Sequence, residues 1–385
     1  MKRSIYNEDH EAFRAVIRDF IAKEVTPHFE QWEKDNLVDR ELFRKLGELG
    51  VMGFDIPEEF GGPGETSYKY QAVMTEECAR AAVQFGHYSV STGIVLPYLL
   101  GLANQEQKQR WFPGIASGDT MLCIAMTEPG TGSDLAGIRT TAKLSEYGTH
   151  YVLNGSKTFI TGARNSELCI VAARTSAPTE QDRRHGLSLL VVATDSEGFE
   201  YGRKLDKIGL KASDTSELSF TDVKVPVENL LGEQDKGFSY LGKNLPRERL
   251  SIGVGACATA TAAIQFAKEY TQQRQVFGKP VAAFQNTKFV LAECAAEVEA
   301  LQAMVDKGIE LDDAGELTAA DAAKIKLFGT EVAARVIDKC LQLHGGYGYM
   351  TEYPIARLYA DTRVSRIFGG TSEVMKTIIA KDLGL

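Results

Sequence analysis

The first third of the chain carries apolar residues at helical spacing. Those near the N-terminus lie one, three or four positions apart, and they are Phe13, Val16, Ile17, Phe20 and Ile21. Such spacing places side chains on one face of an α-helix. The same pattern predicts helices at residues 41–49, 68–82 and 106–115, with a glycine-rich break at residues 61–64. We expect residues 1–120 to form an N-terminal helical domain.

The pattern changes near Met121 to short segments rich in β-branched and other apolar residues. These segments lie at residues 151–153, 158–160, 168–173, 187–193 and 217–223. The dipeptide Asn154-Gly155 between the first two is a strong signal for a β-hairpin turn. We expect residues 121–229 to form a middle domain, built as a small antiparallel β-barrel or sandwich.

Helical spacing returns after Gly232 and continues through the last third. Residues 248–272 are rich in alanine and other small residues, which favours close packing of helices. Thr318 and Asp321 resemble a capping box, and Gly345-Gly346 is typical of a helix end. We expect residues 230–385 to form a C-terminal four-helix bundle domain. The order helical, β, helical predicts an α+β fold, and the lack of βαβ alternation argues against a Rossmann domain.

Composition and charge narrow the classes of function. A chain of 385 residues with a formal net charge of −9 does not suit a nucleic-acid surface. The six cysteines show no paired spacing, so we expect neither a disulfide framework nor a metal site. The N-terminus lacks a signal-peptide pattern, and the apolar runs are too short for a membrane span. We expect a cytoplasmic protein of a bacterial cell, with a processed mitochondrial form as the alternative.

Two segments of the middle domain could hold a flat ligand. Residues 126–134 combine glycines, which let backbone approach a ligand, with hydroxyl groups that suit a polar ring edge or a thioester. A simple turn between a helix and a strand would have the same composition. At residues 157–162, strand alternation puts Phe159 and Thr161 on one face, where a heteroaromatic ring could stack. An ordinary core aromatic is the alternative.

Three segments of the last third have similar double interpretations. Arg274 suits binding of a diphosphate, or its positive charge interacts favourably with the dipole at a helix C-terminus. The glycine pairs at 345–346 and 369–370 could present N–H groups to a phosphate or a carbonyl oxygen, or could end a helix. Glu248 after Pro246 fits the first turn of a helix, where the dipole favours an acidic residue. None of these segments identifies a function alone.

The order and spacing of these segments resembles the acyl-CoA dehydrogenase family over essentially the whole chain. The strings that carry this resemblance are TEPGTGSD, NGSKTFITG, RQVFGKP, LHGGYGY with TEYPIARLYAD, and FGGTSE. PRERL and FGGTSEVMKTIIAKD are most similar to the long-chain branch. The resemblance implies non-covalent FAD at a subunit interface of a homotetramer. It also implies an acyl-CoA substrate and an electron-transfer flavoprotein as electron acceptor.

The resemblance also implies roles for single residues. The residues implied to contact FAD are Ile124, Met126, Thr127, Phe159, Thr161, Arg274, Phe277, Gln342, Gly345, Gly346, Thr371 and Glu373. In this scheme Arg274 and Phe277 reach the FAD of a neighbouring subunit. The residues implied to contact the substrate are Ser133, Arg249, Gly369 and Gly370.

The catalytic base is the main departure from the pattern of many family members. They carry a catalytic glutamate immediately before the Gly-Thr of the last motif, and here Gly369 occupies that position. In the long-chain and isovaleryl branches the base lies on a helix of the C-terminal domain beside an arginine, as Glu248 does before Arg249. The resemblance therefore implies that Glu248 takes the α-proton of a medium- to long-chain fatty acyl-CoA. The β-hydrogen then leaves as hydride to flavin N5, and the product is the trans-2-enoyl-CoA.

Other functions stay open from the sequence alone. One is an isovaleryl or other branched-chain acyl-CoA dehydrogenase. A second is a flavin oxidase or monooxygenase on the same fold. A third is a binding or assembly protein that has lost the chemistry, against which the retention of Glu248 argues.

Overall fold

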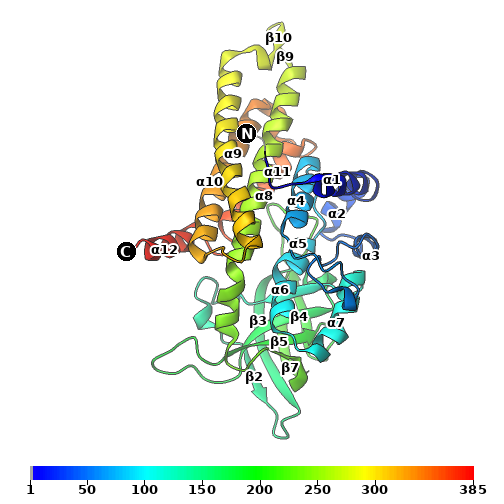
Figure 1. Ribbon diagram of the computed structural model, residues 1–385, viewed down its shortest axis with the longest axis vertical. Helices are drawn as coiled ribbons and strands as arrows, with labels where there is room; N and C mark the ends of the chain where they lie inside the picture. The colour runs from blue at the N-terminus through cyan, green and yellow to red at the C-terminus, as the bar shows by residue number, and fades with distance from the viewer. Residues whose placement is uncertain (1–2) are drawn as a thin grey trace.

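The computed structural model describes residues 3–385 and shows helices at both ends of the chain with a β sheet between them (Figure 1). The N-terminal part confirms the predicted helices. Its main helices are α1 (Glu8–Phe20), α2 (Phe29–Asp35), α3 (Arg40–Glu48), α4 (Lys69–Ala81), α5 (Tyr88–Val90), α6 (Leu96–Leu102) and α7 (Gln105–Ser117). Asn7 and Asn104 cap α1 and α7 through reciprocal capping boxes. A π-helical turn, η3 (Ser91–Val95), joins α5 to α6.

The middle part is one sheet with the strand order β6-β7-β3-β2-β4-β5-β8, and β1 pairs with β4 beside this path. The strands are β1 (Leu122–Ala125), β2 (Thr141–Leu144), β3 (His150–Thr161), β4 (Leu168–Arg174), β5 (Leu187–Ala193), β6 (Phe199–Lys204), β7 (Thr215–Pro226) and β8 (Leu230–Leu231). Most pairs are antiparallel, as expected, but β1 and β2 each pair with β4 in parallel. The sheet is therefore mixed.

The hairpin expected at Asn154-Gly155 was wrong. These residues lie inside β3, where the register against β7 shifts. The Asn154 side chain exchanges two hydrogen bonds of 2.9 Å with Asp222 on β7, one of them from the Asp222 backbone N–H. Asn154-Gly155 forms a β-bulge here. A bulge, like a hairpin turn, needs backbone angles that depart from those of a regular strand. The β2–β3 turn itself lies between Leu144 and His150.

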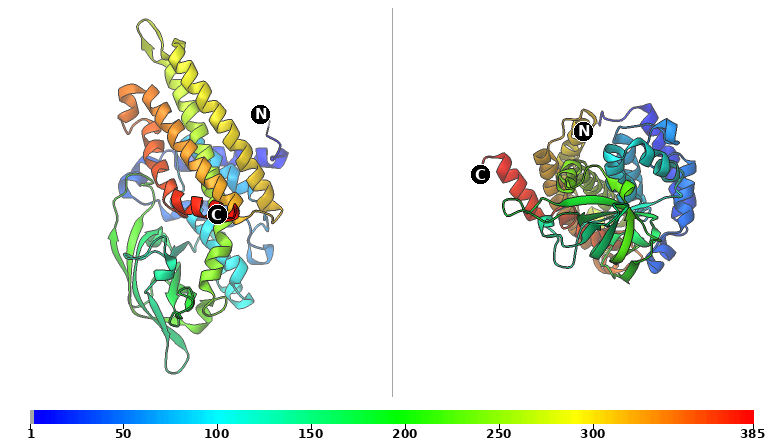
Figure 2. Two further views of the ribbon diagram at one scale, coloured as in Figure 1. Left: turned by 90° about the vertical axis from the view of Figure 1, so that its left-hand side faces the viewer. Right: turned by 90° about the horizontal axis from the view of Figure 1, so that it is seen from below.

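The C-terminal part contains α8 (Gly237–Gln273), α9 (Gln285–Asp313), α10 (Ala319–Leu343), α11 (Pro354–Thr362) and α12 (Ser372–Asp382). The helices α8, α9 and α10 run side by side, and a short hairpin of β9 (Gln275–Val276) and β10 (Lys279–Pro280) joins α8 to α9 (Figure 2). Thr318 caps α10 as predicted, by accepting a 3.1 Å bond from Asp321 N–H. The helix ends at Leu343, and His344 separates it from Gly345-Gly346.

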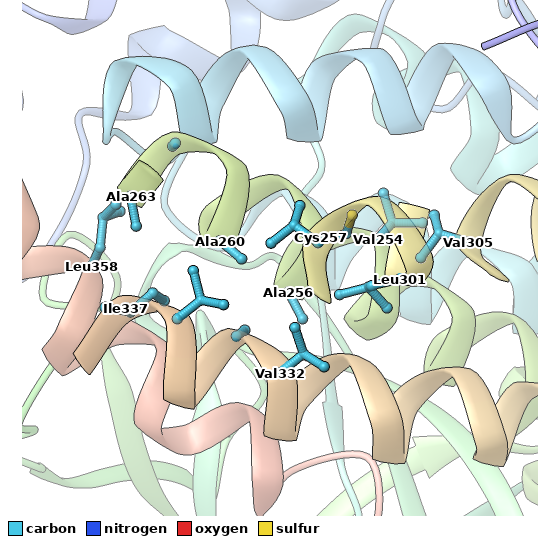
Figure 3. Packing of buried hydrophobic residues seen from close by; sticks show 14 of the residues in the cluster. Val254, Ala256, Cys257, Ala260, Ala263, Leu301, Val305, Val332, Ile337 and Leu358 are labelled. Atoms are coloured by element: carbon cyan, nitrogen blue, oxygen red, sulfur yellow. The ribbon is translucent and has the colours of Figure 1, made fainter. Parts of the chain in front are cut away.

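Small residues of α8 let these helices approach closely. Figure 3 shows Ala256, Ala260 and Ala263 among larger side chains of the neighbouring helices. A Cβ on Gly253 would lie 2.5 Å from the Ile325 side chain, and one on Gly308 would meet the same side chain at 2.5 Å. Glycine is therefore required where α8 and α9 contact α10.

Helix α8 corrects two expectations. It begins at Gly237, so Pro246 and Glu248 lie in its interior rather than in a first turn. By length and composition alone α8 is long and apolar enough to cross a membrane, contrary to the expectation that the apolar runs are too short. However, more than half of its apolar stretch is buried inside the protein, where α8 packs against α4, α9 and α10. Such burial is the pattern of a core helix.

Candidate active site

Glu248 carries a buried carboxyl group in the interior of α8. Its side chain is only 8% exposed, and its Oε2 atom is buried without a hydrogen-bond partner among residues 3–385. Burial raises the pKa of Glu248 to about 7, although the charges of Arg249 and Lys326 oppose the shift. A buried, unpaired carboxyl group with a pKa near neutrality has the properties of a general base.

The Gly369–Gly370 turn lies directly against Glu248. A Cβ on Gly369 would be 3.3 Å from Oε1 of Glu248, and the φ angles of +62° and +97° suit glycine at both positions. Arg249 Nε donates to the Gly369 carbonyl at 3.3 Å, and Lys326 Nζ donates to the Gly370 carbonyl. Within the described chain the N–H of Gly369 reaches no acceptor, so it is available to a ligand.

A cavity of about 400 Å³ opens beside Glu248. Its lining comes from the turn at Asp55, from η3 and α6, and from α8: Asp55, Gly93, Ile94, Pro97, Leu100, Gly101, Lys243, Asn244, Arg247 and Glu248. Arg247 is already neutralised, because its guanidinium lies 2.8 Å from Asp55 and 3.6 Å from Asp312. One wall is formed by small or apolar residues at positions 93–101, which suits an aliphatic acyl chain whose thioester end lies near Glu248.

Three buried polar residues near the predicted site segments were not assigned a role in the sequence analysis. Tyr98 is buried with no hydrogen-bond partner for its hydroxyl among the described residues, and burial together with the charge of Glu248 raises the pKa of its phenol. Lys326 and Lys157 are 1% exposed, yet each looks like an ordinary lysine in a helix or strand. Only the three-dimensional contacts show that these side chains are buried beside functional segments.

The segment around Met126 and Thr127 is held by a buried ion pair. Lys157 donates to the carbonyls of Met126 (3.0 Å) and Ala172 (2.8 Å) and pairs with Glu128 at 2.9 Å. Glu128 in turn accepts bonds from both the backbone and the hydroxyl of Thr140, at 2.9 Å and 2.6 Å. Burial lowers the pKa of Lys157 to about 8, against the charge of Glu128. The two predicted ring-contact residues are thereby fixed to the sheet.

Phe159 presents an exposed ring next to that segment. The N–H of Thr158 donates to the Thr127 carbonyl at 3.0 Å, so the two predicted flavin segments are neighbours. Phe159 has a φ of +60° and lies at a bulge between Lys157 and Ile160, which turns its ring outward with 66% exposed. From Phe159 onward the burial still alternates: Phe159 is exposed, Ile160 is buried and Thr161 is half-buried. Ile124 lies on β1, and Ser133 is exposed in the following loop.

Several other predicted cofactor residues lie near the end of α10 and around the β9–β10 hairpin. Arg274, Gly345 and Gly346 line a second cavity of about 500 Å³. Phe277 lies at the β9–β10 turn and is 96% exposed. Gln342 is exposed near the end of α10. Figures 1 and 2 place the β9–β10 hairpin at the end of the molecule opposite the sheet. One copy of the chain therefore does not bring Arg274 and Phe277 to Phe159.

The last two predicted residues lie at the start of α12. Thr371 caps this helix by accepting a 3.4 Å bond from Val374 N–H, and Glu373 is exposed in the first turn. His344, which precedes the glycine pair, has a structural role. Its Nδ1 lies 2.8 Å from the Cys340 carbonyl, and its ring stacks on Tyr270 at 4.5 Å.

Comparison with known proteins identifies the family. Profiles of the acyl-CoA dehydrogenase N-terminal, middle and C-terminal domains match residues 7–119, 123–223 and 235–384. The mitochondrial long-chain specific acyl-CoA dehydrogenase of Sus scrofa is 42% identical over 381 residues, which cover 99% of this chain and 88% of that protein. The chain belongs to the acyl-CoA dehydrogenase family. The resemblance inferred from the motifs and the three-part α+β fold are confirmed.

Solved structures of this family agree. A crystal structure of acyl-CoA dehydrogenase from Geobacillus kaustophilus is 44% identical, with a TM-score of 0.94 and 99% of each chain covered. A complex of acyl-CoA dehydrogenase with FAD from Bacillus anthracis is 33% identical, with a TM-score of 0.90, and covers 100% of this chain and 69% of that one. A structure described as an electron-transferring flavoprotein of Acidaminococcus fermentans is 32% identical, with a TM-score of 0.92 over 100% and 99% of the two chains.

FAD fits the groups that the chain offers. The exposed Phe159 ring can cover a flat ring system, and the cavity at Arg274 provides a guanidinium together with two glycines. The protein is thus an acyl-CoA oxidoreductase with FAD as its cofactor.

Proposed function

We propose that this enzyme oxidises the α,β bond of a medium- to long-chain fatty acyl-CoA to the trans-2-enoyl-CoA, with Glu248 as the base. The observation that carries the proposal is the buried Glu248 carboxyl, which has no partner for Oε2 among residues 3–385 and opens onto a cavity. Gly369 at the position of the alternative base supports it, since glycine has no proton-accepting group.

The side chains suggest how the proton transfer is assisted. Glu248 takes the α-proton, and its raised pKa brings its basicity closer to that of the substrate carbon. The N–H of Gly369, which has no acceptor in the described chain, donates to the thioester oxygen as negative charge develops there. Such a donor contributes roughly 3 kcal/mol in the transition state. When bound, FAD supplies the acceptor for hydride from the β-carbon.

The cofactor residues support assembly from several copies, as a homotetramer. Phe159 belongs to β3 of the sheet, whereas Phe277 belongs to the β9–β10 hairpin, which lies at the end of the molecule opposite the sheet (Figure 1). A neighbouring copy that places its Arg274 and Phe277 against this copy's sheet would complete the site. Ile124, Thr161, Gln342, Gly345, Gly346, Thr371 and Glu373 belong to the same proposal, with Ser133, Arg249 and Gly370 at the substrate.

The proposed partner is an electron-transfer flavoprotein, which reoxidises the bound flavin. The likeness to the Acidaminococcus fermentans structure supports this choice. We propose the cytoplasm of a bacterial cell as the location, with a processed mitochondrial form as the alternative. The Geobacillus structure supports the first and the Sus scrofa relative the second.

Anaerobic titration of the flavin absorbance with an acyl-CoA panel tests the function. The panel contains butyryl-, octanoyl-, palmitoyl- and isovaleryl-CoA. Bleaching fastest with octanoyl- or palmitoyl-CoA, followed by slow reoxidation in air, is expected. Bleaching by isovaleryl-CoA alone would make the enzyme a branched-chain dehydrogenase. Rapid reoxidation with formation of peroxide would make it an oxidase.

A further inference from the structure

Lys326 is a buried cation with no role in the chemistry described so far. It lies on α10 and is 1% exposed. Its ammonium donates to the carbonyl of Gly370, and within residues 3–385 this is its only hydrogen bond. It forms no ion pair within 4.0 Å in the same part of the chain. Lysine is almost never fully buried without a compensating charge, so a carboxylate is expected near the Lys326 ammonium.

Glu248 supplies a carboxylate whose charge acts on Lys326. A Cβ on Gly369 would lie 3.6 Å from Cε of Lys326 and 3.3 Å from Oε1 of Glu248. The lysine stem and the carboxylate therefore face the same point of the turn, one from α10 and one from α8. Arg249 adds a second cation, which donates to the Gly369 carbonyl at 3.3 Å. Two buried cations thus hold two successive carbonyls beside Glu248.

These two bonds determine how the turn is oriented. In a planar trans peptide the C=O and N–H groups point in opposite directions. Holding the carbonyls of Gly369 and Gly370 therefore also fixes the N–H groups of Gly370 and Thr371. Both glycines have φ in the left-handed region, and glycine has wide backbone freedom without such contacts. The cations restrict the turn that borders the acyl site.

We propose that Lys326 is a positioning residue for the dehydrogenation: it holds the Gly369–Gly370 turn in place and supplies positive charge that faces Glu248. The inference rests on the proposed role of Glu248 as base and deepens it. Lys326 acts through the turn and through Glu248, without touching the reacting atoms. Because a nearby cation favours the carboxylate over the carboxylic acid, it makes the base available at lower pH.

The other charged groups around Glu248 are few. Arg249 faces it from the same helix, and the Tyr98 phenol faces it from α6. Arg247 is occupied by Asp55 and Asp312. Burial and Arg249 lower the pKa of Lys326 to about 8, with Glu248 opposing, so Lys326 is largely charged at neutral pH. Its removal leaves Arg249 as the one cation facing the base among the described residues.

Three substitutions separate the two parts of the role. Lys326→Gln keeps a donor for the Gly370 carbonyl but removes the charge, Lys326→Arg keeps both, and Lys326→Met removes both. Lys324→Met is the matched control, because Lys324 lies on the same helix but its side chain is 41% exposed and pairs with Asp382 at 3.0 Å. Two quantities are followed against pH. One is kcat/KM with the best acyl-CoA of the panel, and the other is the infrared band of the protonated Glu248 carboxyl, assigned by its loss in Glu248→Gln.

The expected result is a shift in both quantities for Lys326→Gln. The acid limb of kcat/KM and the midpoint of the infrared band move to higher pH by about half a unit to one unit. Lys326→Arg and Lys324→Met keep the wild-type values. Lys326→Met shows the same shift and also a lower plateau of kcat/KM, because the turn is released. If Lys326→Met fails to fold, the Gln and Arg variants decide the question.

The two possible failures are distinguishable. Wild-type midpoints in Lys326→Gln would overturn the role of Lys326 and leave Glu248 as the base. A shift in Lys326→Arg equal to that in Lys326→Gln would also overturn it, because that variant retains the charge. Retained flavin reduction in Glu248→Gln would instead overturn the proposed function.

Discussion

Oε1 of Glu248 lies 3.3 Å from the position that a Cβ would take on Gly369. The two sites from which family members project a catalytic carboxylate are therefore neighbours in space, although they lie on different segments. A carboxylate moved from one to the other can reach the same substrate carbon. This relationship explains how a glycine at one site and a glutamate at the other can preserve the reaction.

Relocation of the base tests this relationship. Glu248→Gln should lower the rate of flavin reduction roughly 1,000-fold. Adding Gly369→Glu to this variant should raise the rate again by roughly tenfold. Recovery is partial because φ at position 369 is +62° and the new Cβ would lie 2.5 Å from the Ile252 side chain. Stopped-flow absorbance measures the rates. If the double variant Glu248→Gln/Gly369→Gln shows an equal increase in the rate of flavin reduction, the new carboxylate is not the cause of the recovery.

The pH dependence of catalysis should follow the ionisation of Glu248. Only the carboxylate can accept a proton, so kcat/KM should rise with pH through the pKa of about 7 and then level off. Steady-state assays between pH 5.5 and 9 would show this rise, because they cover pH values below and above the pKa by up to about 2 units. A constant kcat/KM across pH 6–8 would contradict a buried base with a raised pKa.

Stability should change in the opposite direction. Because the folded-state pKa of Glu248 is raised, its contribution to stability is greatest below its ordinary pKa of 4.5 and is lost as pH rises to about 7. The loss amounts to about 3 kcal/mol. Relative to wild type, Glu248→Gln should thus gain stability between pH 4.5 and 7. Chemical denaturation at several pH values measures the difference, and parallel curves for the two proteins would disprove it.

Arg274 should contribute to FAD retention. Arg274→Ala should weaken FAD binding roughly tenfold, since a bond from a charged donor is worth about 1.5–3 kcal/mol. Arg335→Ala is the control, because Arg335 is an arginine of α10 paired with Glu297 at 2.7 Å. Flavin released on dilution is followed by its fluorescence. Equal release from both variants would exclude Arg274 from the diphosphate site.

Lys157 should stabilise the middle part of the protein. Lys157→Met leaves Glu128 buried without its ion-pair partner, which costs about 3–5 kcal/mol. Adding Glu128→Gln should recover part of this loss, because the uncompensated charge is then removed. The exposed Lys143→Met is the control. Thermal unfolding measures the effect, and a loss equal to that of the control would refute the structural role of the pair.

The sequence predicts the helices well because their signals are local. Asn7, Asn104 and Thr318 cap helices through bonds to residues three positions away. The motifs also predicted the family and its FAD cofactor.

The errors come from contacts across the sheet and between helices. Asn154-Gly155 is turn-like alone, but Asp222 on the neighbouring strand holds it in a bulge. Pro246 resembles a helix start, yet tertiary packing continues α8 through it. Lys326 is recognisable only when α10 meets the Gly369–Gly370 turn. Contacts between distant segments decided each of these cases.

The reduction of the enzyme-bound flavin by acyl-CoA, measured anaerobically in Glu248→Gln, tests the central claim most directly. The variant should still bind FAD and acyl-CoA, because glutamine has nearly the same shape as glutamate. Its flavin should stay oxidised for at least roughly 1,000 times longer than that of the wild type. Bleaching at the wild-type rate would show that another group removes the α-proton.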